Sequence, residues 1–328
     1  MSDTIGIVGA GRMGRGIALS YIFAGVPVLL VDLKERSAQQ REQLINSARE
    51  ELRKDLDFLA SVGLVQADAI ASILALASFS HSQDVGCPLA GCAIVYEGVP
   101  EVMAAKREAF RFISSQVSHE AIIASTTSTF LVTELAELVT NPVRFINAHW
   151  LNPAHLMPLV ELSRSAQTSQ LAIKRLIASL ESIGKVPVVC SASPGYIVPR
   201  IQALAMNEAA RLVEEGVASA EDVDKAINVG FGLRFAVLGL LEFIDWGGGD
   251  ILHYASAYLS RTIGDRYIAP EIIGENMRTG KNGLRDGRGF FDYSGIDIDA
   301  YRRQRMLDFV ALLQHRNLLP QYKQSSGQ

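Results

Sequence analysis

The chain has little of what marks several large classes of protein. Three cysteines in 328 residues are too few for a disulfide framework, and no neighbouring His or Cys pair completes a zinc site with Cys87 and Cys92. The net charge is −4, and no Lys/Arg-rich tail suggests a nucleic-acid partner. No apolar run reaches the roughly 18 residues that span a bilayer, and the N-terminus is unlike a signal peptide. We therefore expect a cytoplasmic protein with no metal, no membrane and no nucleic-acid partner.

What is present is ordinary for a globular enzyme, with 48% hydrophobic and 20% charged residues in a chain long enough for two domains. The first half alternates short β-rich runs with helical patterns, whereas the second half is helical throughout. The predicted class is α/β: a Rossmann-type doubly wound sheet in residues 1–191, followed by an all-α domain in residues 192–328. A charge-rich helical pair near residues 37–76 is either a solvated excursion or a flap that reaches substrate.

A dinucleotide-binding pattern opens the chain. The run from Thr4 to Val8 is typical of a buried strand, GAGRMG follows at residues 9–14, and a helical pattern comes next. The run from Val28 to Val31 predicts a second buried strand that ends at Asp32. A lone GxGxxG is weak evidence, but strand, motif, helix, strand and acid in this order are much more specific. We therefore predict NAD as the cofactor, against the alternative of a merely structural glycine turn.

Each residue of the motif has a physical task in the predicted NAD site. Gly9 permits a tight turn, Gly11 lets the backbone approach a pyrophosphate, and Gly14 lets the helix pack on the strand. Arg12 and Met13 occupy the helix N-terminus, where free N–H groups and a partial positive charge would face the phosphates.

Asp32 is the predicted partner of the adenosine ribose. Its carboxylate can accept hydrogen bonds from the ribose hydroxyls and would repel a 2′-phosphate, which favours NAD over NADP. Lys34 and Arg36 lie close by in the sequence and leave that preference open.

Two loops at the predicted carboxyl edge of the sheet carry polar residues. After the strand at residues 91–96, Glu97 and Glu101 flank a turn where a nicotinamide ring would lie, so both are candidate cofactor contacts. After the next predicted strand, Ser128 or Thr129 caps the following helix, or Ser128 presents its hydroxyl to substrate.

A candidate general base follows the next strand. His149 ends the apolar strand at residues 144–148, and Glu161 lies on the strand after it. A nearby carboxylate would orient the imidazole and stabilise its cation, as a general base requires. A histidine beside Trp150 is by itself more often a satisfied core residue. His155 is a competing base, but it follows an Asn-Pro turn, which favours a surface loop.

Several stretches together resemble the NAD-dependent 3-hydroxyacyl-CoA dehydrogenase family across nearly the whole chain: GIVGAGRMGRGIA, EGVPE, ASTTST, AHWLNPAHLMPLVEL, SPGYIVPRIQ and GRGFFDY. The family's Ser, His and Glu fall on Ser128, His149 and Glu161. The resemblance implies that His149 takes the proton of a C3 hydroxyl while a hydride passes to NAD, and that Glu161 orients His149. It also implies that Ser128 and Asn152 contact a small-molecule substrate between two domains, and that the helical domain forms a homodimer.

Three departures from the family pattern bear on the substrate. Pro199 stands where the family has an asparagine that contacts substrate, and it offers neither a side-chain amide nor a backbone N–H. Glu51 and Phe58 stand where the family has a serine and a lysine that touch CoA. Arg234 lies in a stretch similar to the subgroup of λ-crystallin (an L-gulonate dehydrogenase) and carnitine dehydrogenase. There it either clamps a free carboxylate or forms an ordinary interdomain ion pair.

The sequence therefore supports three hypotheses. The first is an NAD-dependent oxidoreductase acting on a short L-3-hydroxyacyl-CoA such as 3-hydroxybutyryl-CoA, which the complete Ser/His/Glu set and the GRGFFDY stretch favour. The second is the same chemistry on a free 3-hydroxy acid, which Glu51, Phe58 and Arg234 favour. The third is a non-catalytic NAD-binding or structural protein, which Pro199 alone suggests.

Overall fold

The computed structural model describes residues 4–84, 86 and 88–321, so Cys87 lies outside the described residues. The chain forms two compact units, Met1–Ala205 and Met206–Gln328. The predicted boundary at 191/192 falls just before α7 (Val198–Glu214), whereas the chain divides into the two units within that helix, between Ala205 and Met206. The change in composition after residue 191 therefore marks the end of the sheet, and a continuous helix carries the chain on into the second unit.

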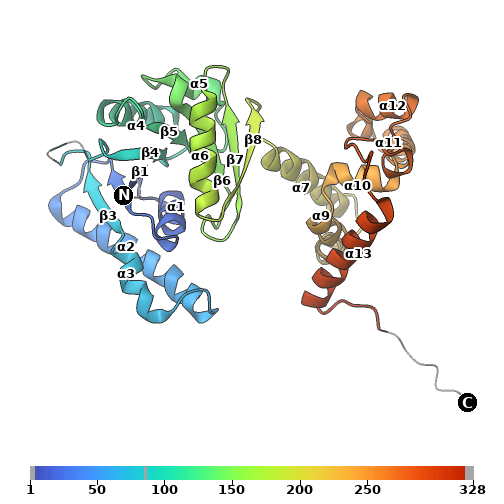
Figure 1. Cartoon of the computed structure of the whole chain (residues 1–328), viewed down its shortest axis with the longest axis horizontal. Helices are drawn as coiled ribbons and strands as arrows, with labels where there is room; N and C mark the ends of the chain where they lie inside the picture. Colours follow the sequence, from blue (N-terminus) through green and yellow to red (C-terminus); the bar gives the residue numbers. More distant parts are fainter. Residues whose placement is uncertain (1–3, 85, 87, 322–328) are drawn as a thin grey trace, which may run out of the picture. The chain divides into compact units, whose positions relative to one another are not determined.

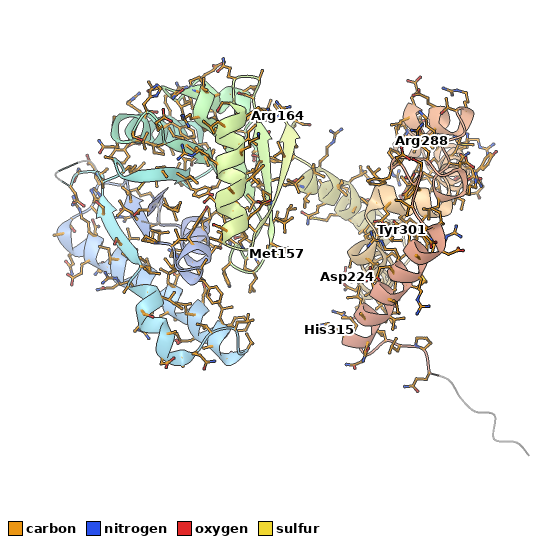
Figure 2. The ribbon with its side chains drawn as sticks, in the orientation of Figure 1. Met157, Arg164, Asp224, Arg288, Tyr301 and His315 are labelled. Atoms are coloured by element: carbon orange, nitrogen blue, oxygen red, sulfur yellow. The ribbon has the colours of Figure 1, made fainter. Side chains whose placement is uncertain are left out.

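Within the described residues, an eight-stranded sheet forms the core of the first unit (Figure 1). The strand order is β3-β2-β1-β4-β5-β6-β7-β8, and every neighbouring pair is parallel except β6 with β7. Figure 2 labels Arg164, which ends β7, and Met157, which lies two residues before that strand begins. The strands are β1 Thr4–Val8, β2 Val28–Asp32, β3 Ala77–His81, β4 Cys92–Glu97, β5 Ile122–Ser125, β6 Phe145–Trp150, β7 Leu159–Arg164 and β8 Val186–Ser191.

Helices cover both faces of the sheet, as the doubly wound prediction requires (Figure 1). Successive strand residues alternate between the faces: Tyr96 and Ile122 join the core beneath α1 and α6, whereas Val95 and Ile123 join the core beneath α4 and α5. These elements are α1 Arg12–Phe23, α2 Ala38–Ser61, η1 Ala67–Ala69, α3 Ile70–Leu74, α4 Met103–Gln116, α5 Val132–Ala136, η2 Pro142–Arg144 and α6 Gln170–Ser182.

The strand order places a ligand crevice at the start of the sheet. Strands β2 and β4 flank β1 on opposite sides, so the crossovers diverge at the carboxyl ends of β1 and β4. In open α/β sheets, ligands bind at such a topological switch point. The glycine turn after β1 and the loop after β4 therefore meet where a dinucleotide would lie.

The sequence pattern does not predict strand β3. Its residues, Ala77–His81, read ASFSH and pair only with β2 at the edge of the sheet. An edge strand with polar residues lacks the continuous apolar run that marks a strand buried on both faces. Its register places His81 beside Asp32, and the His81 side chain is buried with Nε2 at 2.7 Å from the Lys34 carbonyl oxygen.

The second unit is all-α over its described residues, as predicted. The sequence pattern predicts separate helices at residues 220–229 and 235–244. The predicted break between them is wrong, because a π-helical turn continues the first helix through Gly230 and Gly232. A glycine inside a helix costs only about 1 kcal/mol, so the break falls at Gly239 instead, which precedes α10. The elements are α8 Ala220–Ala226, η3 Ile227–Phe231, α9 Gly232–Val237, α10 Leu240–Gly247, α11 Gly249–Thr262, η4 Asp265–Tyr267, α12 Glu271–Arg278, η5 Leu284–Asp286 and α13 Ile298–His315.

None of the helices in the described part of the chain is by itself long and apolar enough to cross a membrane. Residues 220–237 and 240–247 reach the required length and composition only as a pair, and that pair is bent by 88°.

The Gly/Arg/Lys-rich composition of residues 279–291 predicts a solvated loop. That prediction is wrong for the GRGFFDY stretch at the end of this segment. This stretch encloses the carboxylate of Asp245, which accepts backbone hydrogen bonds from Phe290 and Phe291 at 2.9 Å each and one from the Tyr293 hydroxyl at 3.1 Å. A Cβ atom at Gly289 would lie 2.1 Å from Asp245 Oδ1. The stretch, which includes Arg288 (Figure 2), therefore wraps a buried acid.

Candidate active site

His149 and Glu161 form a buried acid–base pair. The antiparallel register of β6 and β7 places the two residues directly opposite each other, so their side chains share one face of the sheet. His149 Nδ1 lies 2.9 Å from Glu161 Oε2, and the two residues are 5% and 0% exposed. Because a carboxylate only accepts, Nδ1 carries the proton and Nε2 is left as the acceptor. The arrangement is that of a general base with its orienting acid.

Three donors hold the Glu161 carboxylate. Its other oxygen, Oε1, accepts the backbone N–H groups of Ile197 and Val198 at 2.9 Å each, at the start of α7. The partial positive charge of that helix end favours a carboxylate there. Glu161 is therefore fixed by backbone on one side while it fixes His149 on the other.

Tyr196 lies against this pair and was missed by the sequence reasoning. Its ring is stacked on the His149 ring, with centroids 4.8 Å apart and an interplanar angle of 15°. Its hydroxyl donates to the Thr127 carbonyl oxygen at 2.7 Å. Burial raises the pKa of the phenol well above its ordinary value, so it stays a donor. Only its position after a Pro-Gly step hints at an unusual backbone.

Ser128 lies in an exposed loop that hydrogen bonds shape from within. Thr127 Oγ1 accepts the N–H groups of Thr129 and Phe130 at 3.3 and 3.0 Å. The prediction that Ser128 or Thr129 caps the next helix is wrong, because α5 begins later, at Val132, with no side-chain cap. Within the described residues the Ser128 hydroxyl makes no hydrogen bond, which leaves it available to a substrate oxygen.

Glu101 supports this loop. Its Oε1 accepts a hydrogen bond from the Thr127 hydroxyl and the backbone N–H groups of Ser128 and Thr129, the latter two at 3.1 and 2.9 Å. Burial alone would raise the pKa of Glu101, but the Thr127 hydroxyl and the nearby charge of Lys106 lower it overall. A contact with the cofactor stays a prediction for Glu101, whereas its support of the Ser128 loop is plain.

Glu97 corrects the prediction of a cofactor contact. Its carboxylate is fully buried and accepts from Lys106 Nζ at 3.1 Å and from Ser125 Oγ at 2.6 Å. A side chain with no exposed surface cannot touch a ligand in the crevice. Lys106, itself 1% exposed, also reaches Glu101 at 3.1 Å. One signal was available: Lys106 shares the apolar face of its helix with residues such as Phe110 and Ile113.

The glycine turn forms a cradle that fits a dinucleotide. Gly9 has a φ of 111°, and a Cβ there would lie 2.6 Å from the Gly98 carbonyl oxygen. A Cβ at Gly14 would lie 2.0 Å from the Gly9 carbonyl oxygen, so the protein's own packing requires both glycines. At Gly11 a Cβ would meet nothing within 4 Å. That glycine instead keeps the groove open, as the approach of a pyrophosphate demands.

The groove itself has a volume of about 400 Å³ and is lined by Gly9, Gly11, Asp32 and the loop at Gly98, among others. Asp32 ends β2 and lies at the rim, where one of its oxygens pairs with Arg36 Nε at 2.5 Å. Within the described residues its second oxygen accepts no hydrogen bond, and Asp32 lines the groove. Arg12 and Met13 begin α1 beside it. These residues fit the adenosine and pyrophosphate portions of NAD.

A second pocket, of about 380 Å³, adjoins the loop after His149. Asn152, exposed in the β6–β7 loop, lines it together with His155 and Arg12. Arg15, which also lines the pocket, is ion-paired with Glu51 at 2.5 Å. His155 is half-buried rather than in an open surface loop, and burial lowers its pKa.

Arg234, the remaining predicted substrate contact, belongs to the second unit. Its guanidinium lies over the Phe243 ring at 5.8 Å from the ring centroid. Arg234 forms no ion pair within the described residues of its own unit, and the interdomain ion pair stays a prediction. The first unit thus pairs His149 with Glu161 and ties the loop that carries Ser128 to the ring stacked on His149, whereas Arg234 belongs to the second unit.

A dinucleotide crevice, a buried His–Glu base pair and a hydroxyl at adjacent strand ends define an NAD-dependent oxidoreductase that acts on CH–OH groups. Comparison with known families agrees: "3-hydroxyacyl-CoA dehydrogenase, NAD binding domain" matches residues 4–193, and "3-hydroxyacyl-CoA dehydrogenase, C-terminal domain" matches residues 195–293. The chain belongs to the 3-hydroxyacyl-CoA dehydrogenase family, and its cofactor is NAD. The alternative of a non-catalytic NAD-binding protein is not supported.

Solved structures and a curated relative show how the family varies. A 3-hydroxyacyl-CoA dehydrogenase from Archaeoglobus fulgidus is 31% identical with a TM-score of 0.77, covering 96% of this chain and 99% of that one. (S)-3-hydroxybutyryl-CoA dehydrogenase from Ralstonia eutropha is 31% identical with a TM-score of 0.63, covering 89% and 99%. The 5-formyl-3-hydroxy-2-methylpyridine 4-carboxylate 5-dehydrogenase of Mesorhizobium japonicum is 28% identical over 95% of this chain and 97% of its own. Similarity therefore extends to enzymes named for CoA thioesters and for a free carboxylate.

Proposed function

We propose that the protein interconverts a short L-3-hydroxyacyl-CoA, such as 3-hydroxybutyryl-CoA, and the corresponding 3-ketoacyl-CoA. The observation that carries the proposal is the 2.9 Å contact between His149 Nδ1 and Glu161 Oε2, which leaves Nε2 as a proton acceptor. The similarity to the enzymes from Archaeoglobus fulgidus and Ralstonia eutropha supports the thioester as substrate.

In the oxidation, His149 Nε2 accepts the proton of the C3 hydroxyl, and Glu161 stabilises the imidazolium that results. The Ser128 hydroxyl donates to the substrate oxygen and holds it near His149. Bound NAD supplies the acceptor for the hydride that leaves C3. In the reverse direction, His149 returns the same proton to the carbonyl oxygen as that oxygen becomes a hydroxyl.

A second candidate is the same chemistry on a small free hydroxy acid. The Arg15–Glu51 ion pair favours it, because it engages one of the two arginines that line the pocket beside Asn152 and so leaves less positive charge for the phosphates of CoA. The exposed Phe58 adds no cation on the same helix. Similarity to an enzyme named for a pyridine carboxylate over nearly its full length points the same way.

A set of carbonyl substrates, two ketones and one aldehyde, separates the two candidates. NADH oxidation is followed at 340 nm with acetoacetyl-CoA, with acetoacetate and with 5-formyl-3-hydroxy-2-methylpyridine 4-carboxylate at equal concentrations. We expect the highest kcat/KM with acetoacetyl-CoA. Turnover of a free acid with none of the thioester would overturn the first proposal and support the second. In that case Arg234→Met should raise KM for the free acid, whereas Arg261→Met, an exposed arginine of α11, should not.

The ribose contact of Asp32 has its own test. Asp32→Ala removes an acceptor at the rim of the groove, so NAD should bind about 10- to 100-fold more weakly, and discrimination against NADP should relax. Titration calorimetry with both cofactors measures the change, and Asp68→Ala, at an exposed site of η1, is the control. An unaltered NAD affinity would show that Asp32 does not contact the ribose.

We also propose that the protein is a homodimer. Large apolar side chains are exposed on two helices, with Leu204 and Met206 of α7 at 70% and 69% and Ile251 and Tyr254 of α11 at 63% and 67%. Exposed apolar surface of this kind supports association with a second copy. Light scattering coupled to gel filtration gives the mass, and a monomer at micromolar concentration would contradict the proposal.

A further inference from the structure

We propose that Tyr196 is a positioning residue that holds the His149 ring and the Ser128 loop in register with each other. The proposal rests on the proposed role of His149 as the base and concerns how that base is kept in place. Three observations carry it: a backbone conformation that a tyrosine rarely adopts, a ring stack on His149, and a hydroxyl bound to the loop.

The backbone of Tyr196 is in the left-handed region. Its φ is 46°, directly after Gly195 with a φ of 75°. A side chain other than glycine, asparagine or aspartate is disfavoured there, and such outliers persist where the surrounding structure holds them. Here the two left-handed residues turn the chain so that the next two N–H groups, of Ile197 and Val198, both meet Glu161 Oε1. Glycine would satisfy that turn, so the tyrosine side chain needs another reason.

The Tyr196 ring restrains the orientation of the His149 ring, which explains why a tyrosine is present. The hydrogen bond from Nδ1 to Glu161 fixes one atom of the imidazole but permits the ring to rock about that bond. The Tyr196 ring, parallel within 15° and 4.8 Å away, covers one face and prevents the rocking. Nε2 then points in one direction, as proton transfer requires.

The hydroxyl connects the base to the loop that carries Ser128. Tyr196 Oη donates to the Thr127 carbonyl oxygen at 2.7 Å, one residue before Ser128. Glu101 holds the other side of the same loop through the N–H groups of Ser128 and Thr129. One buried side chain thus touches both His149 and the support of Ser128, which a residue that only fills space would not need to do.

Other ionisable groups surround the stacked rings of Tyr196 and His149, and none of these groups is changed in the Tyr196 variants. Glu161 and Cys190 lie on β7 and β8, and Glu101 lies in the loop after β4; each of the three, when ionised, raises the pKa of Tyr196. The Tyr196 variants below leave these three groups in place, so a difference between the variants reports the ring or the hydroxyl.

Two variants separate the two contacts. Tyr196→Gly keeps a residue that accepts a φ of 46° and so keeps the N–H groups on Glu161, but it removes the ring. Tyr196→Phe keeps the ring and removes only the hydroxyl. Tyr21→Phe is the matched control, because it removes a buried hydroxyl of the same unit, bound to Tyr96 at 2.8 Å. Tyr21 packs with Trp150, and because successive strand residues face opposite ways, His149 lies on the other face of the sheet.

Steady-state kcat and KM for each substrate are the measurement. For Tyr196→Gly we expect kcat to fall about 10- to 100-fold with KM for NAD unchanged, because the ring that orients Nε2 is gone. For Tyr196→Phe we expect kcat to stay near the wild-type value, with KM for the hydroxy substrate raised and KM for NAD unchanged. Tyr21→Phe should alter Tm alone.

Each result bears on one part of the proposal. A folded Tyr196→Gly variant with wild-type kcat overturns the ring's role. An unchanged KM for the hydroxy substrate in Tyr196→Phe overturns the role of the hydroxyl, and this variant remains informative if the glycine variant does not fold. Retained turnover in His149→Gln defeats the proposed base itself, whereas an inactive His149→Gln beside unchanged Tyr196 variants defeats only this inference.

Discussion

Glu161 and Asp245 are two buried carboxylates with almost the same set of partners. Each accepts two successive backbone N–H groups at 2.9 Å, from Ile197 and Val198 in one case and from Phe290 and Phe291 in the other. Each has one further side-chain donor. For Glu161 that donor is His149, and for Asp245 it is the Tyr293 hydroxyl.

The third partner separates a reactive arrangement from a structural one. Imidazole has a second nitrogen, so Nε2 can accept a proton while Nδ1 keeps its own proton on Glu161. A phenol has no second site. Burial, followed by the charge of Asp245, raises the pKa of Tyr293, so its proton stays between the two groups. Two nearly identical carboxylate cradles thus differ in function because of what the last donor can do.

The largest effect should come from removing the base. We expect His149→Gln to lower kcat by about 10²- to 10⁴-fold, with NAD binding nearly intact, because the glycine cradle lies outside the change. Stopped-flow or steady-state NADH formation measures kcat, and fluorescence titration measures NADH binding. A variant that turns over at the wild-type rate would refute the base assignment.

Glu161→Gln should have the next largest effect. Glutamine keeps an oxygen for the two N–H groups but presents an amide N–H₂ to His149 Nδ1, which forces the proton onto Nε2 and blocks the base. By analogy with acid-to-amide changes in other His–acid pairs, we expect a loss of about 10²-fold or more in kcat. If kcat falls only because less protein is folded, active-site titration with NADH will show it.

Asp245→Asn makes the parallel change in the structural cradle. An amide there retains one acceptor but points donors at a backbone N–H or at Tyr293, so folding should lose about 1–3 kcal/mol. Urea unfolding measures the loss, while kcat per folded molecule should stay near wild type. A drop in kcat like that of Glu161→Gln would mean that the two cradles are not functionally different.

Tyr293→Phe should have the smallest effect at neutral pH, about 1 kcal/mol of folding free energy. Its pH dependence has a definite sign. The folded pKa of Tyr293 lies above its ordinary value of 10.0, so its contribution is complete below pH 10 and is lost as pH rises further. Between pH 10 and 11 the wild type should therefore lose stability faster than Tyr293→Phe in parallel urea titrations. Equal slopes would show that the buried hydrogen bond to Asp245 does not form.

Part of the active site follows from sequence pattern alone. The glycines at 9, 11 and 14, the acid at 32 and the buried strands around them obey local rules of period and turn chemistry, and the structure places them as the pattern indicates. His149 and Glu161 are 12 residues apart, and only their antiparallel register puts them opposite each other. The pattern therefore identified the residue types and their order, but it did not contain the contact.

The errors have a common cause. Glu97 follows a buried strand as a ligand-binding acid would, yet Lys106, nine residues later on α4, neutralises it inside the core. Strand β3 has too few apolar residues to mark it, and its pairing with β2 decides its conformation. In both cases the deciding partner is remote from the residue or belongs to another element, and no local window includes it.

The sequence by itself thus determined the dinucleotide turn, the alternation of strands and helices and the helical second half, because these depend on neighbours a few residues away. Only the tertiary structure decided which carboxylates reach a ligand, which one orients a base and which one is enclosed. It also revealed Tyr196, whose ring meets β6 and whose hydroxyl meets the loop after β5. Those contacts join elements far apart in the chain, and burial, which sets their chemistry, exists only once the sheet is assembled.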